Sequence, residues 1–171
     1  MVRDDNRIIG KQAFVVTQGI ASAMKDLGFD WPCDRAYRTV GGNTELVYRP
    51  SGLEGEGNRE LDARYNCIDG SARFCAAPTL EEAAEWLWRT FGVAVETNIE
   101  TYMTSPEDGS IIPEFRYEVW EFFRHMREDG STDPRWDDRV VDSGDGFADR
   151  PTAMAEGVRS ACNAILEEGR Q

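Results

Sequence analysis

The chain has 171 residues, of which 40% are hydrophobic and 30% are charged, and its formal net charge at pH 7 is −13. No stretch resembles a signal peptide or a membrane span, so length and composition predict one cytoplasmic domain over residues 1–171. The negative charge repels phosphate backbones and anionic lipids, so we expect neither a nucleic-acid nor a membrane partner, and it favours basic partners.

The first predicted helix spans Thr17 to Leu27. Ile20 and Met24 lie four residues apart, and together with Leu27 they form an apolar stripe. Thr17 can cap the first turn with its hydroxyl, and Gly28 follows where a left-handed residue ends many helices. The segment is therefore expected to be an amphipathic helix with both ends specified.

Two short strands are predicted next, at 35–40 and 44–49. The Gly-Gly-Asn sequence between them is typical of a hairpin turn. Residues 50–60 contain several glycines and glutamates and predict a long exposed loop. A third strand around 63–68 stays open, because the segment 61–74 has an ambiguous pattern.

The second predicted helix begins after Thr79. Thr79 and Glu82 have the spacing of a capping box, and Gly92 ends the apolar stripe. Alternation with a period of two then predicts strands at 93–103 and 115–123, joined by a turn. These strands are expected to form a second hairpin.

The segment 125–149 has no periodicity and is predicted to be a long acidic loop. A last helix is predicted over 150–168, with Asp149 as N-cap and Pro151 in the first turn. The element order α-β-β-(β)-α-β-β-α predicts an α+β fold, with an antiparallel sheet of two hairpins packed against about three helices.

Aromatic and arginine side chains, which are enriched at binding hot spots, share one face of the strand 115–123. If the opposite face packs on the helices, this face can present Trp120 to a partner while Arg116 orients an acidic or carbonyl group. The alternative is that the long loop covers this face, or that the sheet is buried on both sides. The candidate partner-binding residues are Trp120, Arg116, Phe122, Arg124, His125 and Trp136.

The predicted acidic loop raises a metal hypothesis. Carboxylates on a flexible loop suit calcium and similar hard cations, although their spacing does not match an EF-hand, and a solvated loop is the alternative. A metal bound there, with His125 as general base, would make the chain a hydrolase or nuclease. The candidate ligands are Asp137, Asp138, Asp142 and Asp145.

The sequence contains no nucleophile elbow, phosphate-binding loop or Cys-X-X-Cys pair. We therefore expect no cofactor and no catalytic residue. In a chain without a secretion signal the cysteines are expected to be free, buried thiols, with disulfides as the alternative. The four cysteines are Cys33, Cys67, Cys75 and Cys162.

A resemblance is carried by several short motifs. They are Leu27-Gly28-Phe29 followed by Pro32-Cys33, the helix start Ala77-Pro78-Thr79-Leu80-Glu81-Glu82-Ala83 with Phe91-Gly92 at the helix end, Phe115-Arg116-Tyr117, and a last helix rich in alanine. In these pieces the chain resembles a group of small uncharacterised proteins from gut Bacteroidales genomes and their phages or mobile elements. It departs from that group in its longer loops. Because the group has no established activity, the resemblance implies an intracellular accessory role and supplies no site residue.

We therefore expect a non-enzymatic binding or interaction module. It would engage a protein or a small ligand through the aromatic sheet face and the acidic loop. The alternative function is a metal-dependent hydrolase or nuclease that uses the carboxylates of 137–149. Homodimerisation through an exposed sheet edge or face stays open.

Overall fold

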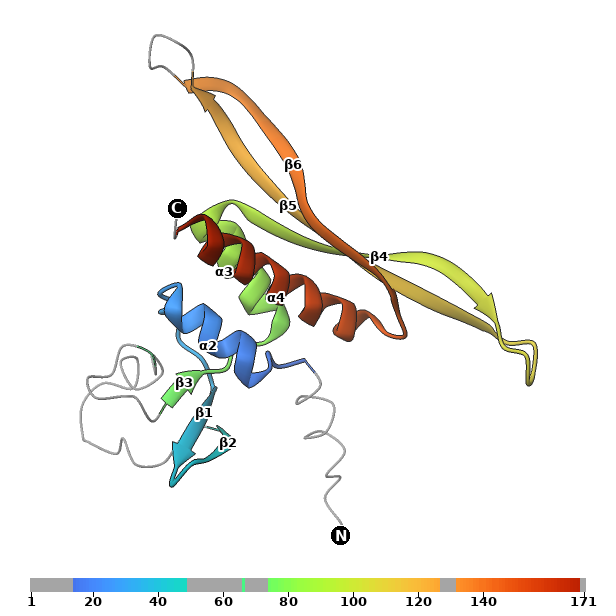
Figure 1. Ribbon diagram of the computed structural model, residues 1–171, viewed down its shortest axis with the longest axis horizontal. Helices are drawn as coiled ribbons and strands as arrows, with labels where there is room; N and C mark the ends of the chain where they lie inside the picture. Colours follow the sequence, from blue (N-terminus) through green and yellow to red (C-terminus); the bar gives the residue numbers. More distant parts are fainter. Residues whose placement is uncertain (1–13, 49–65, 67–73, 127–131, 170–171) are drawn as a thin grey trace. The chain divides into compact units, whose positions relative to one another are not determined.

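The computed structural model describes residues 14–48, 66, 74–126 and 132–169 (Figure 1). In these ranges the chain has three helices and two antiparallel sheets of three strands each, which confirms the α+β class. The chain divides into two compact units, Met1–Ala83 and Ala84–Gln171. The single domain expected over residues 1–171 stays a prediction.

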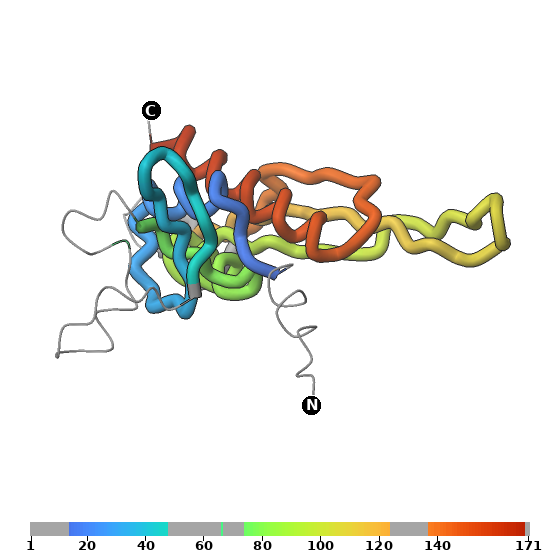
Figure 2. The backbone as a smooth tube through the Cα atoms, turned by 90° about the horizontal axis from the view of Figure 1, so that it is seen from below, coloured from blue at the N-terminus to red at the C-terminus, as the bar shows by residue number. Residues whose placement is uncertain are grey.

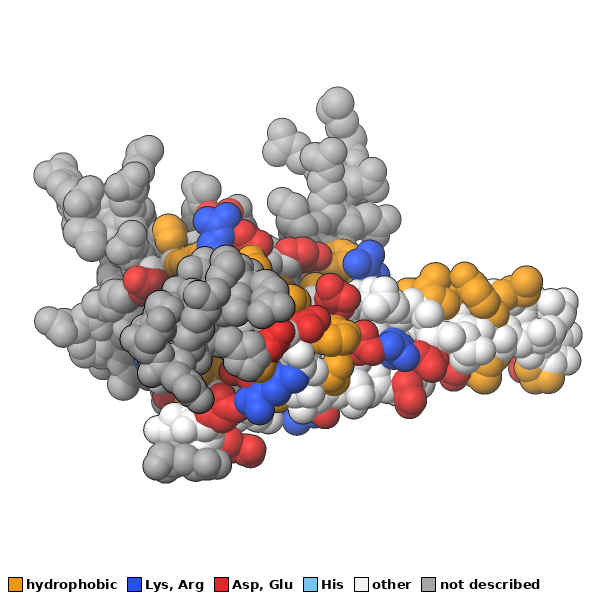
Figure 3. Space-filling view, turned by 90° about the horizontal axis from the view of Figure 1, so that it is seen from above, with side chains coloured by type: hydrophobic (Ala, Val, Ile, Leu, Met, Phe, Trp, Pro, Cys, Tyr) orange, Lys and Arg blue, Asp and Glu red, His pale blue; other side chains and the backbone are white. Residues whose placement is uncertain are grey.

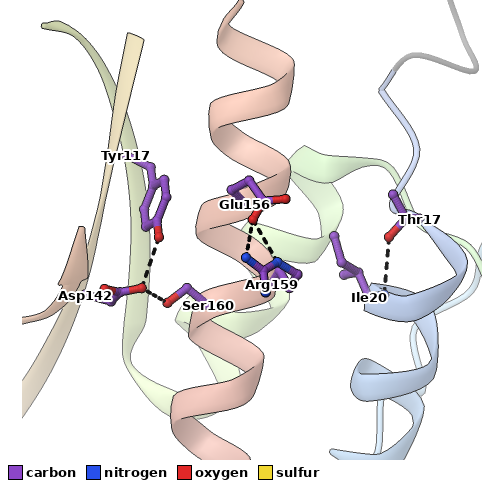
Figure 4. A network of polar contacts seen from close by, with 7 residues as sticks. All are labelled: Thr17, Ile20, Tyr117, Asp142, Glu156, Arg159 and Ser160. Carbon is purple, nitrogen blue, oxygen red and sulfur yellow. Dashed lines mark hydrogen bonds and ion pairs between the residues drawn. The ribbon is translucent and has the colours of Figure 1, made fainter. Parts of the chain in front are cut away.

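The first unit begins with helix α2, Gln18–Asp26. The Thr17 hydroxyl accepts a hydrogen bond from the Ile20 backbone N–H at 3.4 Å (Figure 4). The chain leaves the helix through Gly28, whose φ of 87° is a left-handed conformation that glycine adopts without steric cost. The predicted stripe is buried at Ile20 and Met24, so the helix and both of its caps are confirmed.

The first sheet consists of β1, Arg35–Val40, β2, Asn43–Tyr48, and β3, Phe74–Ala76, in the order β2-β1-β3. The β1–β2 hairpin confirms the prediction from the glycine-rich turn. The third strand lies later in the chain than expected, and the 50–60 loop and most of 63–68 lie outside the described residues. Asn66 stabilises β3, because its side-chain oxygen accepts from the Ala76 N–H at 2.9 Å.

Helix α3 spans Leu80–Phe91 and has the predicted capping box. The Glu82 N–H donates to the Thr79 hydroxyl at 3.1 Å, and the Thr79 N–H donates to the Glu82 carboxylate at 2.7 Å. Gly92, with a φ of 69°, then turns the chain directly into the second sheet. The sequence therefore specified both ends of this helix correctly.

The second sheet consists of β4, Val93–Thr104, β5, Ile111–Met126, and β6, Thr132–Phe147, with β5 in the middle. The β4–β5 hairpin confirms the second predicted hairpin, although β5 is longer than expected. The prediction of a loop at 125–149 is wrong, because most of it forms β6, which pairs antiparallel with β5. Each predicted hairpin thus belongs to its own sheet rather than to a common one.

Helix α4, Arg150–Glu168, lies along one face of the second sheet (Figures 1 and 2). Its N-terminus is capped by Asp149, whose carboxylate accepts from the Thr152 N–H at 2.8 Å, as predicted. The helix contacts the sheet through small residues. The buried side chains of this layer include Val93, Tyr117, Val119, Ala153, Val158, Ala161 and Cys162.

Candidate functional site

A two-stranded ribbon extends beyond the end of α4 in the second unit (Figure 2). The ribbon comprises residues 99–114, that is, the outer part of β4, the connecting turn and the first residues of β5. β6 reaches only as far as Phe115, which pairs with Phe147, so in the described part of the chain 111–114 pair with β4 alone. We call this segment the β4–β5 ribbon.

Pro113 limits how far a third strand could pair along β5. The Phe122 N–H donates to the Gly92 carbonyl at 2.9 Å, so even-numbered residues of β5 direct their backbone groups toward β4. Because the register shifts place the extra residues on β4 and β6, β5 itself is regular and its odd-numbered residues face β6. The nitrogen of Pro113 therefore lies on the β6 side, where it cannot donate to another strand.

Large apolar side chains on the ribbon are exposed to solvent. The exposed fractions are 47% for Ile99, 63% for Tyr102, 50% for Met103, 70% for Ile111 and 41% for Ile112. Figure 3 shows hydrophobic side chains along two sides of this end of the unit. Scattered apolar residues are normal on a protein surface, but a contiguous exposed patch marks an interaction site.

The strand register distributes these side chains over both faces of the ribbon. Met103 pairs with Ile112, and Tyr102 pairs with Pro113 on the opposite face. Ile99 pairs with Phe115 on the face that α4 covers farther along the sheet, and the register shift after Ile99 places Met103 on the opposite face. The ribbon therefore has the two-sided apolar character that is typical of strands with neighbours on both faces.

The charges on the ribbon are all negative. Between residues 98 and 115 the sequence contains Glu100, Glu107, Asp108 and Glu114 but no lysine, arginine or histidine. Hydrogen bonds from Ser110 hold the pKa of the Asp108 carboxyl below its usual value, so this group is ionised at neutral pH. The ribbon thus combines apolar side chains with acidic ones.

The structure places Arg116 among glutamates rather than facing an open site. Its guanidinium donates to Glu100 at 3.0 Å and also pairs with Glu118. The hydrogen bond to Glu100 and the charge of Glu118 raise the pKa of Arg116 above its usual value. A ligand that used Arg116 would have to compete with these two carboxylates.

The predicted aromatic face is partly covered. Phe122 is half-buried and contacts Trp88 of α3 edge-on, with ring centroids 5.1 Å apart. Trp120 is also half-buried, and its indole N–H has no hydrogen-bond acceptor among the described residues. Both side chains lie on the same face of β5 as Ile112. The face is therefore less open than the sequence suggested, and the unpaired indole N–H of Trp120 is itself buried.

Three other predicted binding residues are described only by their backbone. Arg124 and His125 lie at the end of β5, and Trp136 in β6 pairs with Arg124. Their side chains lie outside the described part of the structure. Their proposed role in binding stays a prediction.

The four predicted metal ligands lie on a strand instead of a flexible loop. Asp142 pairs with Val119 on the face covered by α4, whereas Asp138 pairs with Phe122 on the opposite face. Asp137 pairs with Phe123, and Asp145 lies near the other end of β6. Among the described residues no group of three or more His, Cys, Asp or Glu side chains could hold a metal ion.

Asp142 connects the sheet to α4. The Tyr117 hydroxyl donates to its carboxylate at 3.0 Å, and the Ser160 hydroxyl donates to the same oxygen (Figure 4). These hydrogen bonds, that of Ser160 first, hold the pKa of Asp142 below its usual value, while burial raises the pKa of Tyr117. The geometry is that of a structural contact between helix and strand.

A small polar cavity of about 180 Å³ lies in the first unit. Lys25 at its wall donates to the Phe74 carbonyl at 2.9 Å, so its charge is already engaged. The cavity therefore offers little positive charge for binding a small anion. The lining residues are Gln18, Ser22, Lys25, Tyr37, Thr39, Phe74 and Cys75.

The described cysteines are free, as predicted. Burial raises the pKa of Cys33 and of Cys162 to about 12, and Cys75 is half-buried with a raised pKa. Such thiols are poor nucleophiles at neutral pH, because the thiolate is the reactive form. Cys67 lies outside the described residues.

The sequence signal for the ribbon is a pair of isoleucines. Ile111 and Ile112 follow the turn directly, and β-branched residues favour strands. A strand that begins at Phe115, as predicted, leaves out both isoleucines and therefore the pairing of Ile112 with Met103.

No described helix is both long and apolar enough to cross a bilayer. No protein-family model, no curated protein and no solved structure matches this chain.

Proposed function

We propose that this chain is a non-enzymatic protein-binding module that engages its partner through the β4–β5 ribbon. The observation that carries the proposal is the group of five exposed apolar side chains on a ribbon that β6 does not accompany. Burial of such side chains against a partner contributes roughly 25 cal/mol per Å² of apolar surface. Aromatic, methionine and branched aliphatic residues can therefore anchor an interface here.

Polar contacts within the second unit support a binding role over a catalytic one. Arg139 donates to Glu121 at 2.6 Å and to Glu168 at 2.9 Å, and Asp142 is held by two hydroxyls. Groups that are paired in this way hold elements together, and they do not form an open cluster of acids and bases around a cavity. The ribbon, in contrast, presents apolar surface.

The face that carries Met103 and Ile112 is the better candidate for the centre of the interface. It continues along β5 through Glu114, Arg116 and Glu118 to the half-buried Trp120. The aromatic face predicted from the sequence would then be the inner part of a surface whose apolar centre lies on the ribbon.

The proposal is tested by affinity capture from a lysate of the cells that produce the protein. Wild-type protein is compared with the double variant Met103→Thr/Ile112→Thr. Threonine is β-branched and favours strands, and the substitutions leave the net charge unchanged. Val40→Thr is the matched control, because Val40 is 59% exposed on β1 in the other unit. We expect a partner protein that is captured by the wild type and by Val40→Thr but not by the double variant. Equal retention by all three would contradict the proposal.

A further inference from the structure

Met103 and Ile112 form an apolar pair that lies between acidic positions of the ribbon. Residues two apart on a strand share a face and are about 7 Å apart, so Glu114 borders Ile112 on one side. On the other side the turn carries Glu107 and Asp108. An apolar centre thus has carboxylates at both ends.

These carboxylates have no basic neighbour within the ribbon. No lysine, arginine or histidine occurs between residues 98 and 115, and Arg116 is engaged by Glu100 and Glu118. The Ser110 backbone N–H donates to Asp108 at 2.9 Å, which fixes this carboxylate in the turn. The surface is therefore complementary to a partner with positive charge at its rim.

We propose that the occupant of the Met103/Ile112 face is an extended basic segment of another protein. This inference rests on the proposed function and names the chemistry of the partner. In an extended segment, residues two apart point to the same side. The segment would place an apolar side chain on the Met103/Ile112 pair and a lysine or arginine two residues away on either side, toward Glu114 and the turn.

A second copy of this chain fits the surface poorly. Two ribbons would bring identical sets of carboxylates together, and like charges across an interface cost free energy. The net charge of −13 adds long-range repulsion between copies. The same argument disfavours nucleic acid and anionic lipid as occupants.

Pro113 favours contact through side chains over addition of a strand. Its nitrogen lies on the side where β6 ends, so a partner strand there would lack one ladder hydrogen bond. Proline at a sheet edge is a common protection against strand addition. At this edge of the ribbon the basic segment would therefore contact side chains on the face instead of adding a strand.

The test uses a fluorescently labelled synthetic peptide with the sequence Lys-Thr-Val-Thr-Lys-Thr-Val-Thr-Lys, which places lysine and valine on one side. Binding to the full chain is measured by fluorescence anisotropy at low and at physiological salt. Two control peptides are a scramble of the same composition and a version with glutamate for lysine. We expect the patterned peptide to bind more tightly than the scrambled peptide, and its affinity to fall as the salt concentration rises. The glutamate version is expected not to bind.

Double variants distinguish specific binding to the ribbon from a general attraction of the basic peptide to an acidic protein. Met103→Thr/Ile112→Thr should weaken binding of the patterned peptide by about tenfold, since it removes buried apolar surface. Glu107→Gln/Glu114→Gln should weaken it by about three- to tenfold. The matched control Glu81→Gln/Glu167→Gln removes two exposed carboxylates that are not part of the ribbon and should change the affinity less than about twofold.

Three results would overturn the inference. If the two Glu→Gln double variants weakened peptide binding equally, the peptide would be attracted by the net charge alone. Equal binding of the patterned and scrambled peptides would show that the face does not recognise the segment. A dimer in light scattering that Ile112→Thr dissociates would make a second copy the occupant. If affinity capture still depends on the ribbon, the proposed function stands and only the basic partner is wrong.

Discussion

Gly157 allows α4 to approach the second sheet. A Cβ at this position would lie 2.6 Å from Val95 Cγ1 and 3.2 Å from Tyr117 Cβ. Tyr117 is buried and Val95 is half-buried, so an added methyl group would have to displace packed side chains. The small residue therefore determines how closely the helix packs on β4 and β5.

Gly157→Ala is predicted to destabilise the protein by about 1–3 kcal/mol, because overpacking outweighs the gain in helix propensity. Gly19→Ala is the matched control, since Gly19 lies in α2 and its Cβ would meet nothing within 4 Å. The control is expected to be neutral or slightly stabilising. Urea unfolding measures both. A Gly157→Ala variant as stable as the control would show that α4 does not pack this closely.

Asp142 gives the contact between α4 and the sheet a pH dependence. Its pKa is lower in the folded protein than in the unfolded chain, so the ionised form stabilises the fold. This contribution is present above the ordinary carboxyl pKa of about 4 and is lost as pH falls through the lower folded value.

Asp142→Asn is therefore predicted to lower the free energy of unfolding near pH 6 and to converge with the wild type in strong acid. Ser160→Ala should reproduce most of this difference, because it removes the hydroxyl that accounts for the largest part of the pKa shift. Denaturant unfolding at several pH values measures both variants. A difference that grows as pH falls would contradict the account.

Strand β6 is the element that the sequence did not predict. The helices α2, α3 and α4 were predicted almost to the residue, because their caps and apolar stripes are local features. The alternation along β6 is interrupted, since each of its three register shifts against β5 places extra residues on β6. Each shift resets the period of two, and the many aspartates and glycines lower the strand propensity. The strand forms because it pairs with β5, and this non-local interaction is not visible in the local sequence pattern.

The candidate site was predicted in part. Trp120, Phe122 and Arg116 lie on one face as expected from alternation, but the partners of that face, Trp88 and Glu100, come from other elements. Contacts between elements are not visible in the spacing of residues along the chain. For the same reason the pairing of Glu168 with Arg139 explains a helix-end carboxylate that the helix dipole alone disfavours.

Hydrogen exchange tests whether β6 is a strand in solution. We predict that about half of the amides in 137–147 exchange more slowly than in an unstructured peptide, because alternate N–H groups face β5. Amides of the exposed 105–110 turn serve as the comparison, since their hydrogen bonds stay within the turn itself. Exchange of 137–147 at the rate of the turn would favour the loop that the sequence suggested.

The net negative charge of the whole molecule opposes association of the exposed ribbon with other copies. A charge of −13 at neutral pH opposes association of the apolar side chains, and this repulsion disappears near the isoelectric point of about 4.5. Charge and apolar surface therefore act in opposite directions on self-association. Their balance changes with pH.

We predict that the wild type is monomeric at pH 7 and associates near pH 4.5, and that Met103→Thr/Ile112→Thr associates less. Val40→Thr should behave as the wild type, since Val40 lies outside the ribbon. Light scattering against pH measures the three proteins. Identical association of all three would show that the ribbon is not the adhesive surface.

Site-specific photocrosslinking in living cells tests the protein-binding role of the ribbon most directly. A photoreactive phenylalanine derivative replaces Ile112, which is 41% exposed, and in a control it replaces the exposed Glu81 on α3. The account predicts a crosslinked product with another protein from position 112 and none of the same mass from position 81. No product from position 112, or the same products from both positions, would contradict it.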